Sequence, residues 1–235
     1  MSHGRRATRW PFALALGVSL LGAGCSAGPN ATPTPSPDLE PTTYTLCPPS
    51  GELPASTENE AAISVIEGRL ATLGISGQVT IGSCLDVALE GTPEDDALRA
   101  VLFGSGLASI VAVPPTRAAE VVVGLAPPDE LTTVVDPNSG AIAGATVEGP
   151  AVDVQLSDAG AALLSTWTMS HAGEALALVI DGRVIGSVPI DGTNASGGLR
   201  IPVTTEAGLT PAAVAALLAA GPLPGDWRQP EAPQG

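Results

Sequence analysis

Few residues in this sequence have the types and the spacing that catalysis requires. Histidine is the most common general base near neutral pH, and the 235-residue chain has two, His3 and His171. His3 lies in a leader that we expect to be removed, so Ser170-His171 is the place where a serine and a base are neighbours. We expect this pair at a helix end, where adjacent side chains diverge and a cation interacts with the helix dipole. The sequence therefore predicts no hydrolytic site and no enzyme activity.

The acidic clusters have structural interpretations that we favour over chemical ones. The segment Thr92-Pro93-Glu94-Asp95-Asp96 is typical of a helix start, with Thr92 as N-cap and the acids against the dipole. Asp136-Pro137-Asn138-Ser139-Gly140 has part of a calcium-loop spacing but lacks the downstream Glu, so a turn is preferred. A single remaining histidine argues against a zinc site. We expect no metal and no cofactor, and we interpret Arg183 as a solvated turn residue.

The N-terminus has the features of an export signal. Arg5, Arg6 and Arg9 precede an apolar run at 10–21 that is too short to span a bilayer and is followed by small residues. We predict a signal peptide at 1–24. Its end, Leu20-Leu21-Gly22-Ala23-Gly24-Cys25-Ser26, resembles the lipobox of bacterial lipoproteins, although Gly22 stands where that family usually has Leu. The resemblance implies lipidation of Cys25 by acyl chains such as palmitate, on the outer face of the cytoplasmic membrane; the alternative is a plain secretory signal.

Two cysteines and an acidic surface remain after the leader is removed. Cys47 and Cys84 form an even pair in an oxidising compartment, and we expect a disulfide between them. The mature chain keeps 6 arginines and all 24 acids, has no lysine, and carries a net charge of −18. Such a surface repels nucleic acid and anionic headgroups. A solubilising acidic surface is favoured over a specific cationic partner.

The next segments are a tether and a small α+β subdomain. Residues 25–42 are rich in Pro and Thr and predict a semi-extended tether. Residues 43–115 have the order of a ferredoxin-like βαββαβ fold, with strands near 43–47, 79–81, 85–89 and 107–113 and helices near 57–74 and 92–103. In that fold the third strand lies between the first two, which brings Cys47 next to Cys84.

The second half is centred on a β-hairpin. Asp181-Gly182 joins two apolar runs within residues 175–190, and this dipeptide between such runs is a strong hairpin signal. A strand at 152–156 and a helix at 158–170 precede it, and a strand at 199–203 and a helix at 210–220 follow. Residues 120–225 therefore form a second α+β subdomain, and 226–235 a flexible tail.

Three segments carry a resemblance to a known family. They are Val-Gln-Leu-Ser-Asp-Ala-Gly-Ala at 154–161, Leu-Ala-Leu-Val-Ile-Asp-Gly-Arg-Val-Ile at 176–185 and Ala-Leu-Leu-Ala-Ala-Gly-Pro-Leu-Pro at 216–224. They resemble the head of the first periplasmic domain of SecD, a subunit of the SecDF export motor. Residues 61–90 are similar to the base of that domain. The resemblance implies an α+β fold of base and head, and it carries over no catalytic residue.

The resemblance also frames the expected function. SecD has further membrane helices that carry proton-coupled transport, and we expect neither those helices nor that activity here. We expect a membrane-tethered lipoprotein that binds exported polypeptide or an envelope protein partner. The alternative is a structural or small-ligand-binding lipoprotein that reuses the fold.

Overall fold

The computed structural model describes residues 42–92, 95–192 and 197–228. The predicted signal peptide, the lipidation site Cys25, all of the tether but Thr42, and the end of the tail lie outside these residues. Within them, no helix combines the length and the hydropathy that crossing a bilayer requires.

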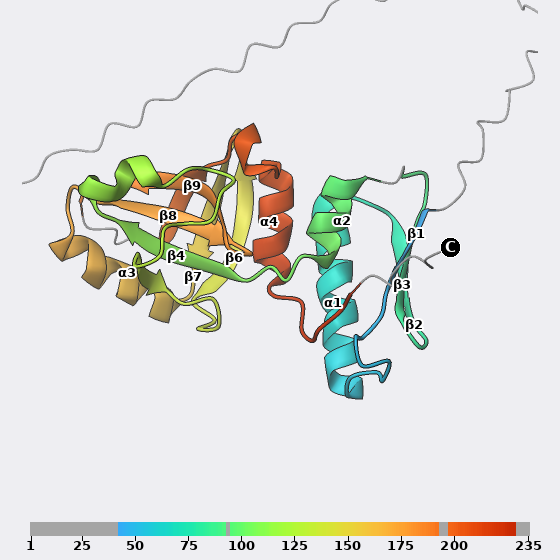
Figure 1. Ribbon diagram of the computed structural model, residues 1–235. Helices are drawn as coiled ribbons and strands as arrows, with labels where there is room; N and C mark the ends of the chain where they lie inside the picture. Colours follow the sequence, from blue (N-terminus) through green and yellow to red (C-terminus); the bar gives the residue numbers. More distant parts are fainter. Residues whose placement is uncertain (1–41, 93–94, 193–196, 229–235) are drawn as a thin grey trace, which may run out of the picture. The chain divides into compact units, whose positions relative to one another are not determined.

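The first subdomain is a three-stranded antiparallel sheet covered by two helices (Figure 1). Its strands are β1 (Thr42–Leu46), β2 (Gly77–Ile81) and β3 (Leu85–Leu89), in the order β1-β3-β2. The third strand is therefore central, as predicted. Burial alternates along β3, so one face of the sheet is apolar.

Helices α1 (Ser56–Leu73) and α2 (Asp96–Phe103) cover that apolar face. The core between them is formed by side chains from both helices and all three strands, among them Leu46, Ile66, Leu85, Leu89 and Leu102. Helix α1 ends at Gly74, whose φ of 67° favours glycine. Helix α2 begins later than predicted: its N-cap is Asp95 rather than Thr92, and the Asp95 carboxylate accepts from Ala97 N.

The fourth strand of the predicted ferredoxin-like unit belongs to a different sheet. Strand β4 (Ala108–Val113) pairs with β5 (Thr132–Val135) and β8 (Ala175–Ile180), not with β1. The physical reason is that β4 is apolar on both faces. Ala108 and Ile110 contribute to one core, and Val111 and Val113 to another. A sheet covered on both sides suits such a strand better than one with a solvated face. The first subdomain thus ends before residue 108 rather than at 115.

The second subdomain contains two further sheets. One has the order β5-β4-β8-β9, where β9 is Arg183–Pro189, and the other the order β10-β7-β6. The remaining elements are β6 (Ile142–Glu148), β7 (Ala151–Leu156), β10 (Gly198–Pro202), α3 (Asp158–Ser170), α4 (Pro211–Ala220) and the short 3-10 helices η1 (Pro115–Glu120) and η2 (Thr205–Ala207). The segment at 121–125 is an irregular connector.

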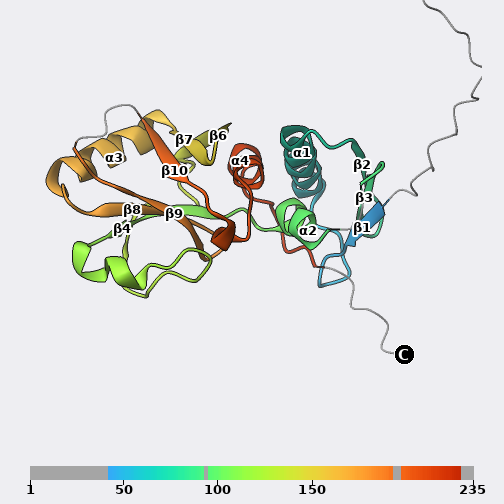
Figure 2. The same ribbon diagram turned by 90° about the horizontal axis from the view of Figure 1, so that it is seen from above.

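Local sequence signals account for the main elements of this subdomain. Asp181 and Gly182 have φ values of 49° and 75°, which confirms the predicted hairpin turn between β8 and β9. The side chains of Ser157 and Thr210 accept hydrogen bonds from first-turn N–H groups of α3 and α4. Helix α4 packs against both β6 of its own subdomain and α1 of the first one (Figure 2), where the Cβ that Gly68 lacks would lie 3.3 Å from that of Ala220.

Candidate functional site

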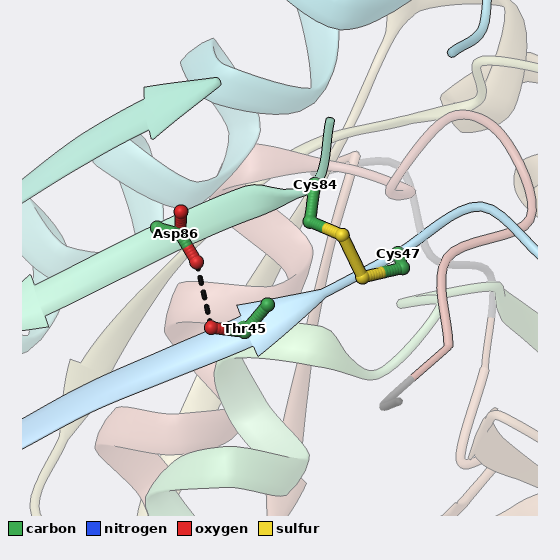
Figure 3. Close-up of a disulfide and its surroundings, with 4 residues drawn as sticks. All are labelled: Thr45, Cys47, Cys84 and Asp86. Carbon is green, nitrogen blue, oxygen red and sulfur yellow. Dashed lines mark hydrogen bonds between the residues drawn. A yellow bond between two sulfur atoms is a disulfide. The ribbon is translucent and has the colours of Figure 1, made fainter. Parts of the chain in front are cut away.

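A disulfide closes one end of the β1–β3 ladder in the first sheet. Cys47 and Cys84 are bonded, with their Cα atoms 4.4 Å apart (Figure 3). Two residue pairs away along the same ladder, the Thr45 hydroxyl donates to the Asp86 carboxylate at 2.6 Å. The backbone of Cys47 also exchanges two hydrogen bonds with Arg228, at 2.7 and 2.9 Å. Cys47 therefore connects β1 to β3 through the disulfide and to the returning C-terminal segment through its backbone.

A buried arginine that no sequence motif indicated joins the helices. The Arg69 side chain on α1 is fully buried. Its guanidinium donates to the carbonyl oxygens of Val101, Leu102 and Gly104 at 2.7–3.0 Å, and to that of Gly221 at 3.0 Å. These are carbonyls at the C-terminal ends of α2 and α4, where a cation is favourable. The only sequence signal was its place three residues after Ile66 on the buried side of α1.

Burial and charge act on Arg69 in opposite directions. Desolvation lowers its pKa to about 10, and the negative charge of Asp181 partly offsets this change. A pKa of about 10 still leaves the guanidinium protonated at neutral pH. Arg69 therefore acts as a permanent cation that holds carbonyl groups from two subdomains.

Asp181 has a second role besides its place in the hairpin turn. Its carboxylate accepts from Leu107 N at 2.9 Å, from Gly106 N at 3.1 Å and from the Ser105 hydroxyl. Its own N–H donates to the Leu107 carbonyl at 2.9 Å. The turn thus fixes the segment through which the chain leaves the first subdomain.

An apolar cleft lies between the first subdomain and the start of α4. Its volume is about 580 Å³, within the range typical of ligand sites. The apolar lining comes from the end of α1, from α2 and from the turn into α4, and includes Leu73, Ile75, Leu98, Val101, Leu209 and Ala213. Its polar groups are Thr92, Asp95, Thr205 and Thr210. Such a surface fits aliphatic side chains, and it presents no nucleophile paired with a base.

A second cleft borders the other side of α2 and has a different character. Its volume is about 550 Å³, and Arg99, Arg183, Phe103 and Trp227 are among its lining residues. Arg99 pairs with Asp96 at 2.8 Å and lies over the Tyr44 ring, 5.4 Å from its centroid. This cleft is therefore lined by two arginines, whereas no described lining residue of the apolar cleft is an arginine.

The Ser170–His171 pair is closer than predicted, yet it is not arranged for catalysis. Ser170 Oγ lies 2.9 Å from His171 Nδ1, because His171 has left the helical conformation, with φ −123° and ψ 33°. The same Nδ1 lies 2.8 Å from the Trp167 carbonyl oxygen. A carbonyl only accepts, so Nδ1 carries the proton and is not free to take one from the serine. The Trp167 ring stacks on the imidazole, with centroids 3.6 Å apart.

The other residues considered from sequence have structural places. Asp136 accepts from Asn138 N at 2.8 Å, which is the expected turn. Glu94 lies outside the described residues. Within residues 42–92, 95–192 and 197–228 no group of three His, Cys, Asp or Glu side chains could hold a metal ion. Arg183 is exposed beside the hairpin turn but lines the second cleft, which its sequence position did not indicate.

Comparisons with known proteins identify the fold. No family model matches the chain, and no curated protein matches it. The chain is similar to the crystal structure of SecDF in its super-membrane-facing form, with a TM-score of 0.58 and 19% identity over 80% of this chain and 29% of that one. It is also similar to a structure of SecDF, described as a membrane component that enhances protein export, with a TM-score of 0.56 and 21% identity over 81% and 99% of the two chains.

These likenesses show a SecD-like fold and confirm the predicted α+β class. The chain spans about 29% of the first SecDF chain. At 19–21% identity the likeness concerns the fold alone.

Proposed function

We propose that this chain is an extracytoplasmic, lipid-anchored protein that binds extended segments of exported polypeptide in the apolar cleft. The observation that carries the proposal is the cleft itself, with aliphatic side chains from α1, α2 and the turn before α4 around about 580 Å³. Unfolded polypeptide exposes aliphatic side chains, and such surfaces are recognised by apolar grooves. The SecD-like fold supports the proposal, because a similar protein is described as enhancing protein export.

The proposal assigns a binding role without catalysis. It rests on the His171 imidazole, whose Nδ1 is bonded to a carbonyl instead of serving a nucleophile. Anchoring through Cys25 remains a proposal that rests on the lipobox-like residues 20–26. An anchor would hold the cleft near the membrane from which exported chains emerge.

Binding of a labelled apolar peptide to the purified full chain tests the proposal. Leu98 and Leu209 are half-buried cleft residues, so Leu98→Asp or Leu209→Asp places a charge in the apolar lining. We expect each variant to bind at least about tenfold more weakly in fluorescence anisotropy. Leu163→Asp is the matched control, because Leu163 is 52% exposed on α3 outside this cleft. Equal affinity in all four proteins would exclude the cleft as the binding site.

A second candidate function, assembly with an envelope protein, is favoured by the free edge of β2. In the β2–β3 ladder, hydrogen-bonded and non-hydrogen-bonded residue pairs alternate. The bonds from Glu90 N to Ser76 O and from Gly82 N to Cys84 O show which pairs are hydrogen-bonded. The backbone groups of Gly77, Val79 and Ile81 therefore point away from β3. No described residue pairs with them. The strand has no charge, proline or bulge, the features that natural edges use against strand addition.

Crosslinking in cells tests this second candidate. A photo-crosslinker in place of the exposed Thr80 should give one defined adduct with an envelope protein. The added substitution Val79→Pro removes an outward N–H while leaving the bonds to β3, so it should abolish the adduct without unfolding the sheet. An adduct that persists in the Val79→Pro protein would rule out pairing at this edge.

A further inference from the structure

The charge around the apolar cleft restricts what it can bind. No arginine is among its described lining residues, and the whole chain contains no lysine. Among the lining residues that the structure describes, the one ionisable group is the exposed Asp95. Asp95 Oδ1 accepts from Ala97 N at 2.9 Å, and no hydrogen bond among the described residues occupies Oδ2. One carboxylate oxygen is therefore available at the margin of an aliphatic surface.

Five of the six arginines within residues 42–228 lie elsewhere. Arg69 is buried against helix ends, and Arg99 and Arg183 line the cleft on the opposite side of α2. Arg117 and Arg200 pair with Glu120 and Glu148. The formal net charge of −15 for the sequence is thus not compensated at the apolar cleft. The net charge and the Asp95 carboxylate therefore favour cations over anions at the cleft.

The helix ends at the cleft do not reverse this sign. The N-termini of α2 and α4 both lie there, and each carries a partial positive charge of about half a unit. However, Ala97 N already bonds to Asp95 and Ala213 N to Thr210. The full charge on Asp95 outweighs the partial charge of the α2 terminus.

We propose that the cleft selects extended segments in which a short aliphatic run is flanked by lysine or arginine. This inference rests on the proposed polypeptide binding and specifies its substrate class. The aliphatic side chains enter the cleft, and the flanking cations remain at its margin, where Asp95 and the acidic surface attract them. A segment flanked by acids meets the same apolar surface but is repelled.

Three peptides of about nine residues, roughly 30 Å long when extended, test the selection on the purified full chain. They share one aliphatic centre and differ in flanks of lysine, glutamate or serine. At about 10 mM salt, where the Debye length is about 30 Å, we expect the lysine-flanked peptide to bind at least about tenfold more tightly than the glutamate-flanked one. At about 1 M salt, where the Debye length is about 3 Å, the preference should fall to about twofold or less.

Asp95→Asn isolates the local carboxylate. Asparagine keeps the oxygen that caps α2, so the helix is retained. We expect this variant to lose about a factor of two to three in its preference for the lysine-flanked over the glutamate-flanked peptide. Glu60→Gln is the control, because it removes the same charge at a distance from the cleft. Glu60 lies 13 residues, about 20 Å, before the lining residue Leu73 on α1.

The outcomes separate this inference from the proposed function. If all three peptides bind with equal affinity at low salt, charge selection is wrong while polypeptide binding stands. If none binds, or if Leu98→Asp leaves binding intact, the cleft is not the site and both proposals fail. A tighter complex with the glutamate-flanked peptide, or filling of the cleft by a second copy of the chain in sedimentation experiments, would also overturn the selection.

Discussion

The guanidinium of Arg69 donates to the carbonyl oxygen of Gly221, 152 residues further along the chain. The same side chain holds the C-terminal end of α2 through Val101, Leu102 and Gly104. One buried cation therefore joins the first subdomain to the point where the chain returns from the second.

Replacing Arg69 should destabilise the protein strongly. Arg69→Met keeps much of the apolar volume but leaves two buried and two partly buried carbonyl oxygens without this donor, and we expect the free energy of unfolding to fall by about 3–5 kcal/mol. Arg69→Lys retains the charge but cannot reach all four oxygens, so its loss should be smaller. Urea denaturation measures both, with the exposed Arg200→Lys as control. A loss below about 1 kcal/mol for Arg69→Met would contradict this account.

Asp181→Asn separates the role of Asp181 in the hairpin turn from its hydrogen bonds to residues 105–107. Asparagine tolerates the positive φ of the turn, but it replaces one of the acceptor oxygens by a donor. We expect a loss of about 1–2 kcal/mol and faster hydrogen exchange at Gly106 N and Leu107 N, measured by NMR. Asp191→Asn, an exposed change after β9, should leave both amides unaffected. Unchanged exchange at Gly106 and Leu107 in Asp181→Asn would show that the carboxylate does not hold this segment.

Removal of the disulfide should act mainly on the unfolded chain. Cys47 and Cys84 are separated by 37 residues, and closing a loop of that length is worth about 3–4 kcal/mol. The double change Cys47→Ser and Cys84→Ser should lower the free energy of unfolding by that amount. Dithiothreitol should lower the free energy of unfolding of the wild type by the same amount and leave that of the double variant unchanged. If the reductant destabilises the double variant too, its effect does not come from this disulfide.

The ion pair of Glu120 predicts a pH dependence. Its hydrogen bond to Arg117 lowers the pKa of Glu120 below the ordinary 4.5. Because the folded pKa lies below the unfolded one, the stabilisation is present above pH 4.5 and is lost as the pH falls through the folded pKa. Glu120→Gln should therefore lower the free energy of unfolding at pH 7, and the difference from wild type should shrink below pH 4.5. As a control, Glu52→Gln at an exposed position should show the same pH dependence of the free energy of unfolding as the wild type.

Lipidation predicts a defined chemical change at Cys25. The wild type should incorporate labelled palmitate and accumulate as a precursor when globomycin blocks lipoprotein signal processing. Cys25→Ser should take up no label, while Cys47 and Cys84 still form their disulfide. Labelling of the serine variant, or a processed wild type without lipid, would favour the plain secretory signal.

Local signals in the sequence predicted most elements but not all of their partners. The Asp181-Gly182 turn follows from the φ values that those two residues tolerate, and the caps of α3 and α4 follow from Ser157 and Thr210. The sheet of β4 could not be predicted from its own residues, because an apolar strand is compatible with either sheet. Its place depends on strands β5 and β8, which come later in the chain.

The candidate site was less accessible to sequence reasoning. The apolar cleft brings Leu73 and Leu98 near Leu209, residues that no local pattern connects. The bonds of Arg69 end on backbone carbonyls, which have no residue signature. The cysteine pairing was open to prediction because it required only strand order within one small sheet.

The disulfide has a mechanical consequence for a chain pulled by its N-terminal end. Strand β1 has five residues, and Cys47 follows it directly. Tension applied at Thr42 can peel at most this one strand before it reaches a covalent bond that reduction alone can open. Tension between a membrane anchor and a captured polypeptide would therefore pass through the sulfur bridge into β3, and it could not unravel α1 or β2 from the N-terminal side.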